Sequence, residues 1–338
     1  GRELADAAVG KVIHVEQIEE PVAPRLKVCL RHPVQVGVVA HQLGGREEIF
    51  AELVEAADFP FDVVTVQSGG NDMKDRLIAE KNSPLADVVL GGSHVENLAL
   101  VENDILAPYV PAWADDVDEV FVGPDNKYWP WALDTVHFTY NAEFMGPGTD
   151  LPAPSDWTDL VDPMYKDTYY FWGSGGTTGG MLVSSMLIRY RDPNGVIGVS
   201  QEGWDLVEGI YANAQNPAPS DWREGLRGES YGGSIWGGGV VQVSRDKEID
   251  LQVMEPPVGT PFFPACIGVV DTGKELKMEY ARQFVDWWGS AETQVAWGGA
   301  TGQAPANVEA LREIGGATQE LTERLDVQDL DWQFIYEN

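Results

Sequence analysis

A proline-rich break followed by a new packing layer limits what this chain can fold into. Residues 256–261 read Pro-Pro-Val-Gly-Thr-Pro. Proline fixes φ and lacks an N–H donor, so this segment neither extends a helix nor pairs as a central strand. An apolar run at 265–270 follows, and the helix predicted at 280–290 carries its apolar residues on one stripe. We interpret 256–261 as a crossing between two structural blocks.

Size and charge narrow the class of protein. A chain of 338 residues is expected to form two domains, and a hydrophobic content of 43% is enough for two cores. The net charge of −32, from 54 acidic and 22 basic residues, argues against nucleic acid as a partner, because phosphates need a basic face. The sequence contains no run of 18 apolar residues, so no membrane span is predicted. No signal-peptide pattern opens the chain, so we expect residue 1 to begin a processed or truncated product.

The two cysteines, Cys29 and Cys266, both lie in apolar runs, at 26–30 and 265–270. This setting favours two buried strand thiols over one long-range disulfide. We therefore expect the two residues not to be bonded to each other.

Strand and helix signals alternate along the first third of the chain, which predicts a parallel α/β sheet. The strands are expected at 26–30, 61–66 and 86–90, and the helices at 44–57 and from 71 to about 81. The pattern changes at residue 128, where a strand at 135–140 and a short helix with Ser155 as its N-cap are expected. A second α/β block follows, with strands at 168–172 and 234–243 and helices at 181–190 and 204–213.

Several blocks in this order resemble the type II extracellular solute-binding proteins of ABC importers, in the branch of the ferric-ion and organophosphate binders. The blocks are 86–90 with 105–109, then 154–166, then 284–294. The resemblance implies an α/β, two-lobed, periplasmic-binding-protein-like fold of type II, with a ligand cleft between the lobes and two hinge crossovers. It implies an N-terminal extension at 1–25, a discontinuous lobe 1 at 26–134 plus 262–338, and a lobe 2 at 135–261.

The same resemblance implies a function in transport. The chain would be the substrate-binding subunit of an ABC transporter and not an enzyme. It would have no catalytic residues, metal or cofactor, and its partners would be a small-molecule ligand and a membrane permease. We expect a monomer that is secreted, either periplasmic or anchored at the cell surface. A carbohydrate-active enzyme with a tryptophan-rich sugar platform and a chemoreceptor binding domain are the alternatives from other classes.

A tyrosine pair marks the iron-binding members of the resembling family. The corresponding region here, 226–239, carries Trp236 and glycines instead. The adjacent Tyr169 and Tyr170 lie within a predicted strand, where alternation turns the two rings to opposite faces. Ferric ion needs oxygen donors that converge on one point, so the sequence disfavours it.

Three strand-to-helix junctions rich in Gly, Ser and Thr are candidate ligand contacts, because glycine admits a close backbone approach and a helix start offers unpaired N–H groups. Helix capping or a tight turn is the structural alternative at each junction. The candidates there are Ser68, Gly69, Gly70, Gly92, Ser93, Ser174, Gly176, Thr177 and Thr178.

Further candidates flank these junctions. Arg31 and His32 follow the first predicted strand and would add positive charge, and Asp134 lies at the first crossover as a ligand carboxylate or a hinge cap. Trp236 and Gly237 would form an aromatic wall beside a glycine-rich backbone; Trp129, Trp131 and Trp172 are further wall candidates or core residues. Because the local donors favour negative charge, we expect a small polar solute that is anionic or phosphorylated. A ferric ion or a polyamine-like cation is the alternative.

Overall fold

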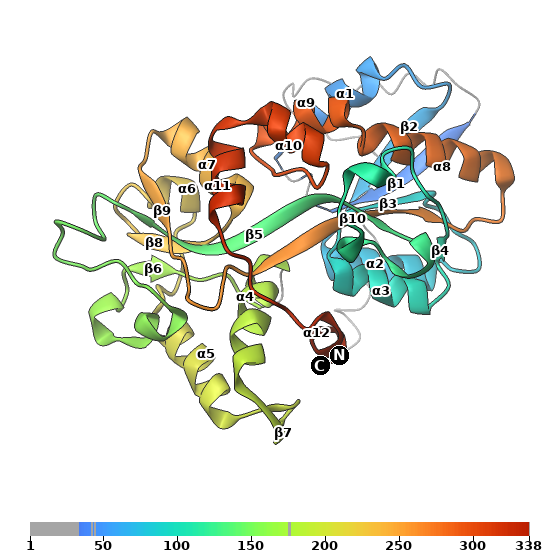
Figure 1. Cartoon of the computed structure of the whole chain (residues 1–338). Helices are drawn as coiled ribbons and strands as arrows, with labels where there is room; N and C mark the ends of the chain where they lie inside the picture. Colours follow the sequence, from blue (N-terminus) through green and yellow to red (C-terminus); the bar gives the residue numbers. More distant parts are fainter. Residues whose placement is uncertain (1–33, 42, 44, 175–176, 338) are drawn as a thin grey trace, which may run out of the picture.

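The computed structural model describes residues 34–41, 43, 45–174 and 177–337, and Figure 1 shows two lobes side by side. The predicted strand at 26–30 and the extension at 1–25 lie outside the described residues. Lobe 1 begins with the elements β1 (Gln35–Ala40), α1 (Glu47–Ala56), β2 (Asp62–Gln67), α2 (Gly70–Ala79), β3 (Val88–Leu90), α3 (His94–Glu102) and β4 (Leu106–Ala107). The strand β1 was not predicted from the sequence.

A long strand then carries the chain into lobe 2. This strand is β5 (Trp129–Asn141). Lobe 2 contains β6 (Tyr169–Tyr170), α4 (Thr177–Leu187), β7 (Arg191–Val196), α5 (Gln201–Asn213), α6 (Trp222–Gly225), β8 (Gly232–Trp236), α7 (Gly237–Lys247) and β9 (Leu251–Val253). Short 3-10 turns lie at Ala114–Asp116, Glu119–Phe121, Pro124–Asn126, Trp157–Val161, Pro163–Tyr165 and Ile188–Tyr190.

The chain returns to lobe 1 through a second long strand, β10 (Phe262–Val270), directly after the proline-rich segment. Helices complete the fold: α8 (Glu275–Trp288), α9 (Ala291–Thr301), α10 (Val308–Ile314), α11 (Gly316–Arg324) and α12 (Trp332–Glu337). The chain thus passes between the lobes along β5 and β10, which confirms the two predicted crossovers.

The strands form one hydrogen-bonded path in the order β2-β1-β3-β10-β5-β8-β6, with β4 on β10 and β9 on β5. The path passes from lobe 1 to lobe 2 within β5 itself. Residues 129–135 of β5 pair with β10, whereas residues 136–140 pair with β8. The change of partner between Thr135 and Val136 marks the hinge in this strand.

Each lobe has its own core. In lobe 1 a chain of aromatic rings links the strands to the helices. The ring centroid of Trp288 lies 5.2 Å from those of Trp131 and Trp297 and 5.5 Å from that of Phe50. Contacts of this kind contribute about 0.5–1.5 kcal/mol each beyond the area they bury. Trp129 and Trp131 are 7% and 1% exposed, so both belong to this core.

In lobe 2 the tyrosine pair divides between two cores, as strand alternation predicted. Tyr169 packs in the cluster with Phe138 and Trp157, and Tyr170 packs in the cluster with Trp222 and Ile235.

Local details differ from the sequence expectations at two places. The predicted strand at 234–243 is wrong beyond Trp236, because Gly237 begins the helix α7. The N-cap of the turn at Trp157 is Asp156 instead of Ser155; the Asp156 carboxylate accepts from the Trp157 N–H, and the Asp159 side chain reaches back to complete a capping box.

The cysteine prediction is confirmed for one residue. Cys266 is a free, buried thiol on β10, and burial raises its pKa well above the ordinary value. Cys29 lies outside the described residues.

Candidate functional site

A buried polar cluster occupies the hinge where β5 leaves lobe 1. The Asp134 side chain accepts a hydrogen bond from Gln303 Nε2 at 2.7 Å, and Gln303 Oε1 accepts from Arg46 Nη1 at 3.2 Å and from Trp297 Nε1 at 2.8 Å. Asp134, Gln303 and Arg46 are 4%, 1% and 7% exposed. We call Arg46, Asp134 and Gln303 the hinge cluster.

Three segments bring the hinge cluster together. Arg46 is the N-cap residue of α1 and Asp134 lies on β5. Gln303 begins a stretch that runs beside β5, where Leu133 donates to the Ala304 carbonyl and Ala306 donates to the Trp131 carbonyl, both at 3.0 Å.

The charges of the hinge cluster are only partly balanced. Burial raises the pKa of Asp134 from 3.8 to about 6, although Arg46 and the Gln303 hydrogen bond oppose the shift. Burial lowers the pKa of Arg46; the charge of Asp134 raises it, and the charge of Arg223, from lobe 2, lowers it further. The pKa of Arg46 thus responds to a carboxylate of the hinge cluster and to an arginine of lobe 2.

Arg223 is supported by an aromatic group in lobe 2. Its guanidinium lies 4.4 Å from the centroid of the Trp222 ring, a cation–π distance. The Trp222 ring is 5.5 Å from Trp236, 6.2 Å from Trp172 and 6.3 Å from Tyr170. We call Tyr170, Trp172, Trp222 and Trp236 the aromatic group. Trp172 and Trp236 are half-buried, so part of each indole is open to solvent.

The predicted residues Trp236 and Gly237 lie where lobe 2 meets the hinge. A Cβ on Gly237 would come within 2.4 Å of Thr135 Oγ1, and one on Gly238 within 3.1 Å of the Gln303 backbone. A small cavity of about 10 Å³, lined in part by Gly237 and Thr135, lies between them. The glycines at the start of α7 are therefore required by packing against the hinge.

The predicted junctions of lobe 1 have clear local roles. Gly91 and Gly92 adopt φ of +107° and +74°, which a side chain would strain, and Ser93 caps α3 in a capping box with Glu96. At the other junction, Gly69 is the N-cap of α2 and Gly70 begins that helix. The Ser68 N–H donates to the Ala40 carbonyl.

In the lobe 2 junction, Ser174 lies in an exposed turn and Thr177 and Thr178 begin α4. A Cβ on Gly179 would approach the Gly173 carbonyl oxygen to 2.2 Å, so the turn needs glycine there. Gly176, like Arg31 and His32, lies outside the described residues.

Sequence reasoning identified Asp134 and Trp236 but missed Arg46, Gln303, Arg223 and Trp222. Local signals exist for two of them. Arg46 follows Gly44-Gly45 in the segment between β1 and α1. Arg223 is the second residue of α6, which is capped by Asp221, whose carboxylate accepts from the Arg223 N–H at 3.1 Å.

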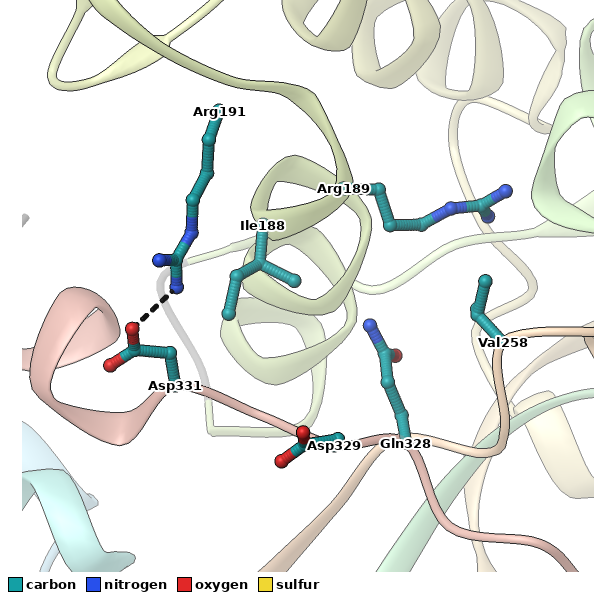
Figure 2. Close-up of a pocket in the computed structure, with 7 residues that line it drawn as sticks. All are labelled: Ile188, Arg189, Arg191, Val258, Gln328, Asp329 and Asp331. Carbon is teal, nitrogen blue, oxygen red and sulfur yellow. Dashed lines mark ion pairs between the residues drawn. The ribbon is translucent and has the colours of Figure 1, made fainter.

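A larger cavity, of about 630 Å³, lies away from the hinge cluster, between the end of α4 and the C-terminal segment (Figure 2). Its two arginines are already paired. Arg189 binds both carboxylate oxygens of Asp156, at 2.7 and 2.8 Å, and Arg191 pairs with Asp331 at 2.8 Å. The cavity is an open seam between lobe 2 and the C-terminal segment.

Two absences hold for the part of the chain that the structure describes. There, no three His, Cys, Asp or Glu side chains are grouped so that they could hold a metal ion. Within the same residues, every helix is too short or too polar to cross a bilayer.

Two α/β lobes joined by two crossovers, with a buried polar cluster at the hinge, are the architecture of a hinged binding protein of the periplasmic type. Residues 83–338 match the model of the bacterial extracellular solute-binding proteins, and the chain belongs to this family. It is 30% identical over 303 residues to the probable ABC transporter periplasmic-binding protein y4fP of Sinorhizobium fredii, covering 88% of this chain and 81% of the relative.

Solved structures confirm the fold. The periplasmic binding protein AfuA from Actinobacillus pleuropneumoniae, solved with exogenous fructose-6-phosphate bound, superposes with a TM-score of 0.69 at 18% identity, covering 90% of this chain and 93% of AfuA. The ferric binding protein from Campylobacter jejuni gives a TM-score of 0.70 at 15% identity, covering 90% of this chain and 95% of that protein. The chain is therefore a solute-binding subunit of an ABC transporter, and its family works with a small-molecule ligand and a membrane permease.

Proposed function

We propose that the chain captures a small organic anion, a phosphorylated or phosphonate solute, between its lobes and presents it to the permease. The observation that carries this proposal is the buried guanidinium of Arg46 in the hinge cluster, together with the half-buried Arg223 of lobe 2, whose charge lowers the pKa of Arg46. The two guanidinium groups would offer positive charge to an anion, in a chain whose net charge is −32.

Arginine suits this role because its planar fork matches phosphate and carboxylate oxygens, and burial strengthens each such hydrogen bond. The aromatic group would accept the carbon body of the solute, since half-exposed indoles pack against apolar or ring-shaped groups. The fructose-6-phosphate of the AfuA structure is a solute of this class, and it supports the choice by analogy.

Ferric ion is the less favoured ligand. The two adjacent tyrosines do not converge: the Tyr169 hydroxyl donates to the Leu160 and Ile210 carbonyls within one core, and Tyr170 lies fully buried in another. At the start of α7, where iron-binding relatives are expected to carry tyrosines, this chain carries Trp236 and Gly237.

Several finer points belong to the same proposal. Lobe 1 would comprise residues 26–134 and 262–338, and lobe 2 residues 135–261. The protein would act as a monomer outside the cytoplasm, in a periplasm or anchored at the cell surface. It would bind its solute without turnover.

Titration calorimetry with fructose 6-phosphate, 2-aminoethylphosphonate, spermidine and ferric citrate tests the ligand class. We expect heat from at least one phosphorylated or phosphonate compound, and a loss of affinity of about tenfold or more in Arg46→Met and Arg223→Met, because each would remove one charge-assisted contact. Arg312→Met, on the exposed side of α10, is the matched control. Binding of spermidine or iron with no response to either phosphorus compound would overturn the proposal.

A further inference from the structure

The last helix of the chain lies between the two lobes and touches both. In Figure 1, α12 lies below β5 and β10, next to α3 of lobe 1. The segment that leads to it is anchored to the second crossover, where the Thr260 N–H donates to the Asp326 carbonyl at 2.7 Å and Gln328 donates back to the Thr260 carbonyl at 2.9 Å.

On the lobe 2 side, β7 folds back on Val199, and we call residues 191–199 the β7 hairpin. The helix α12 and the residue before it contact this hairpin. Arg191 pairs with Asp331 at 2.8 Å (Figure 2), and its guanidinium lies 4.4 Å from the Phe334 ring centroid. A Cβ on Gly198 would lie 3.1 Å from the same ring, so the hairpin fits closely against Phe334.

On the lobe 1 side, α12 runs along α3 from one end to the other. Trp332 stacks at a tilt on His94, at 5.8 Å between ring centroids, and the Tyr336 hydroxyl donates to the carboxylate of Glu102. His94 and Glu102 are the first and last residues of α3, so the contact covers the whole helix.

Trp332 also reaches the crossover itself, with its ring 5.9 Å from that of Phe262 on β10. A rotation of the lobes about β5 and β10 changes the distance between α3 and the β7 hairpin. A six-residue helix bound to both cannot keep both sets of contacts through that rotation.

We propose that α12 is a latch that stabilises the lobe arrangement described here and has to release one lobe when the lobes rotate. The latch rests on weak, separable contacts: the Arg191–Asp331 pair is about half exposed and borders the 630 Å³ seam. It sets the balance between lobe arrangements, whatever solute the hinge takes.

The test measures the distance between the lobes by single-molecule energy transfer. Labels are placed on cysteines replacing the exposed residues Glu52 of α1 and Glu208 of α5, in a Cys29→Ser background. The variants are a chain ending at Leu330, which lacks the latch, and the point substitutions Asp331→Asn and Tyr336→Phe. Arg312→Ala, remote from these contacts, is the control.

We expect the shortened chain to shift the ratio of lobe arrangements by roughly five- to tenfold, and each point variant to shift it by a smaller factor in the same direction. The control should match the parent. If the shortened chain does not fold, the two point variants decide the question. Distance distributions that stay unchanged, although hydrogen exchange shows that α12 has detached from α3, would overturn the proposal.

Discussion

Lys277 of α8 donates to both carboxylate oxygens of Asp87, at 3.1 and 2.9 Å, although Asp87 is only 1% exposed. The same carboxylate accepts a hydrogen bond from the Gly37 N–H of β1 at 2.8 Å. One aspartate thus joins the start of β3, the neighbouring strand and a helix that the chain reaches only after lobe 2 is complete.

The first prediction concerns this pair. Lys277→Met leaves the buried Asp87 without its cation and should lower the free energy of unfolding by about 2–3 kcal/mol, less than for a fully buried pair because Lys277 is about one-third exposed. Urea denaturation checks the value. Lys74→Met removes a pair with the largely exposed Asp75 and should change stability by less than about 0.5 kcal/mol. Equal effects of the two substitutions would contradict the prediction.

The second prediction uses the contrast between the adjacent tyrosines. The Tyr170 hydroxyl is buried and has no hydrogen-bond partner among the described residues, whereas the Tyr169 hydroxyl donates to two carbonyls. Tyr169→Phe should lower the free energy of unfolding by about 1–2 kcal/mol, while Tyr170→Phe should be neutral or stabilise by up to about 1 kcal/mol. Thermal melts of both variants distinguish the two roles, and a larger loss in Tyr170→Phe would reverse the assignment.

The third prediction concerns pH. Burial raises the pKa of Asp134 to about 6 in the folded chain, from 3.8. The folded state therefore holds this proton more tightly, and the contribution of Asp134 to stability falls as pH rises from about 4 to about 6, by about 3 kcal/mol at most.

Asp134→Asn should not show this dependence. The stability of the parent relative to Asp134→Asn should thus decline over that interval in denaturation at fixed pH steps. Asp329→Asn, an exposed carboxylate, serves as the control. A difference between parent and Asp134→Asn that stays constant with pH would exclude a raised pKa.

The fourth prediction compares two glycines. Gly179→Ala would place a Cβ 2.2 Å from the Gly173 carbonyl oxygen and should cost about 2 kcal/mol or more, since the backbone has to move. Gly299→Ala, in α9 with nothing within 4 Å of the added Cβ, should stabilise by about 0.5–1 kcal/mol. Chemical denaturation of both variants measures the difference, and a tolerated Gly179→Ala would show that the turn before α4 can rearrange.

The sequence predicted the architecture better than the site. The proline-rich crossing and the alternating blocks are local signals, and they led to two lobes with two crossovers. The error at α7 also has a physical cause: the valines that follow the glycines favour a strand locally, but Gly238 at the start of α7 packs at close range against the Gln303 backbone. Packing with a distant segment overrode the local preference.

The hinge cluster shows why the site could not be predicted in full. Asp134 stood out because it lies at a crossover. Its partner Gln303 lies 169 positions later in the sequence, and Gln303 in turn accepts a hydrogen bond from Arg46, which lies 257 positions before Gln303. Neither residue carries a motif, so only the folded chain shows that they meet. Arg223 lies over the ring of Trp222, which belongs to the aromatic group, and the members of that group come from separate segments of lobe 2.

The position of β10 in the sheet fixes an order of assembly. This strand lies between β3 and β5, yet ribosomes reach its last residue, Val270, only after most of the 338 residues have been made. Until then lobe 1 lacks a central strand, and its early strands cannot join β5. The strands of lobe 2, from β5 to β9, follow one another in the sequence and can complete their own pairings first. The nascent lobe 1 therefore remains an incomplete sheet until β10 has been made. A sheet that depends on such a distant strand has a long-range topology of the kind that folds slowly.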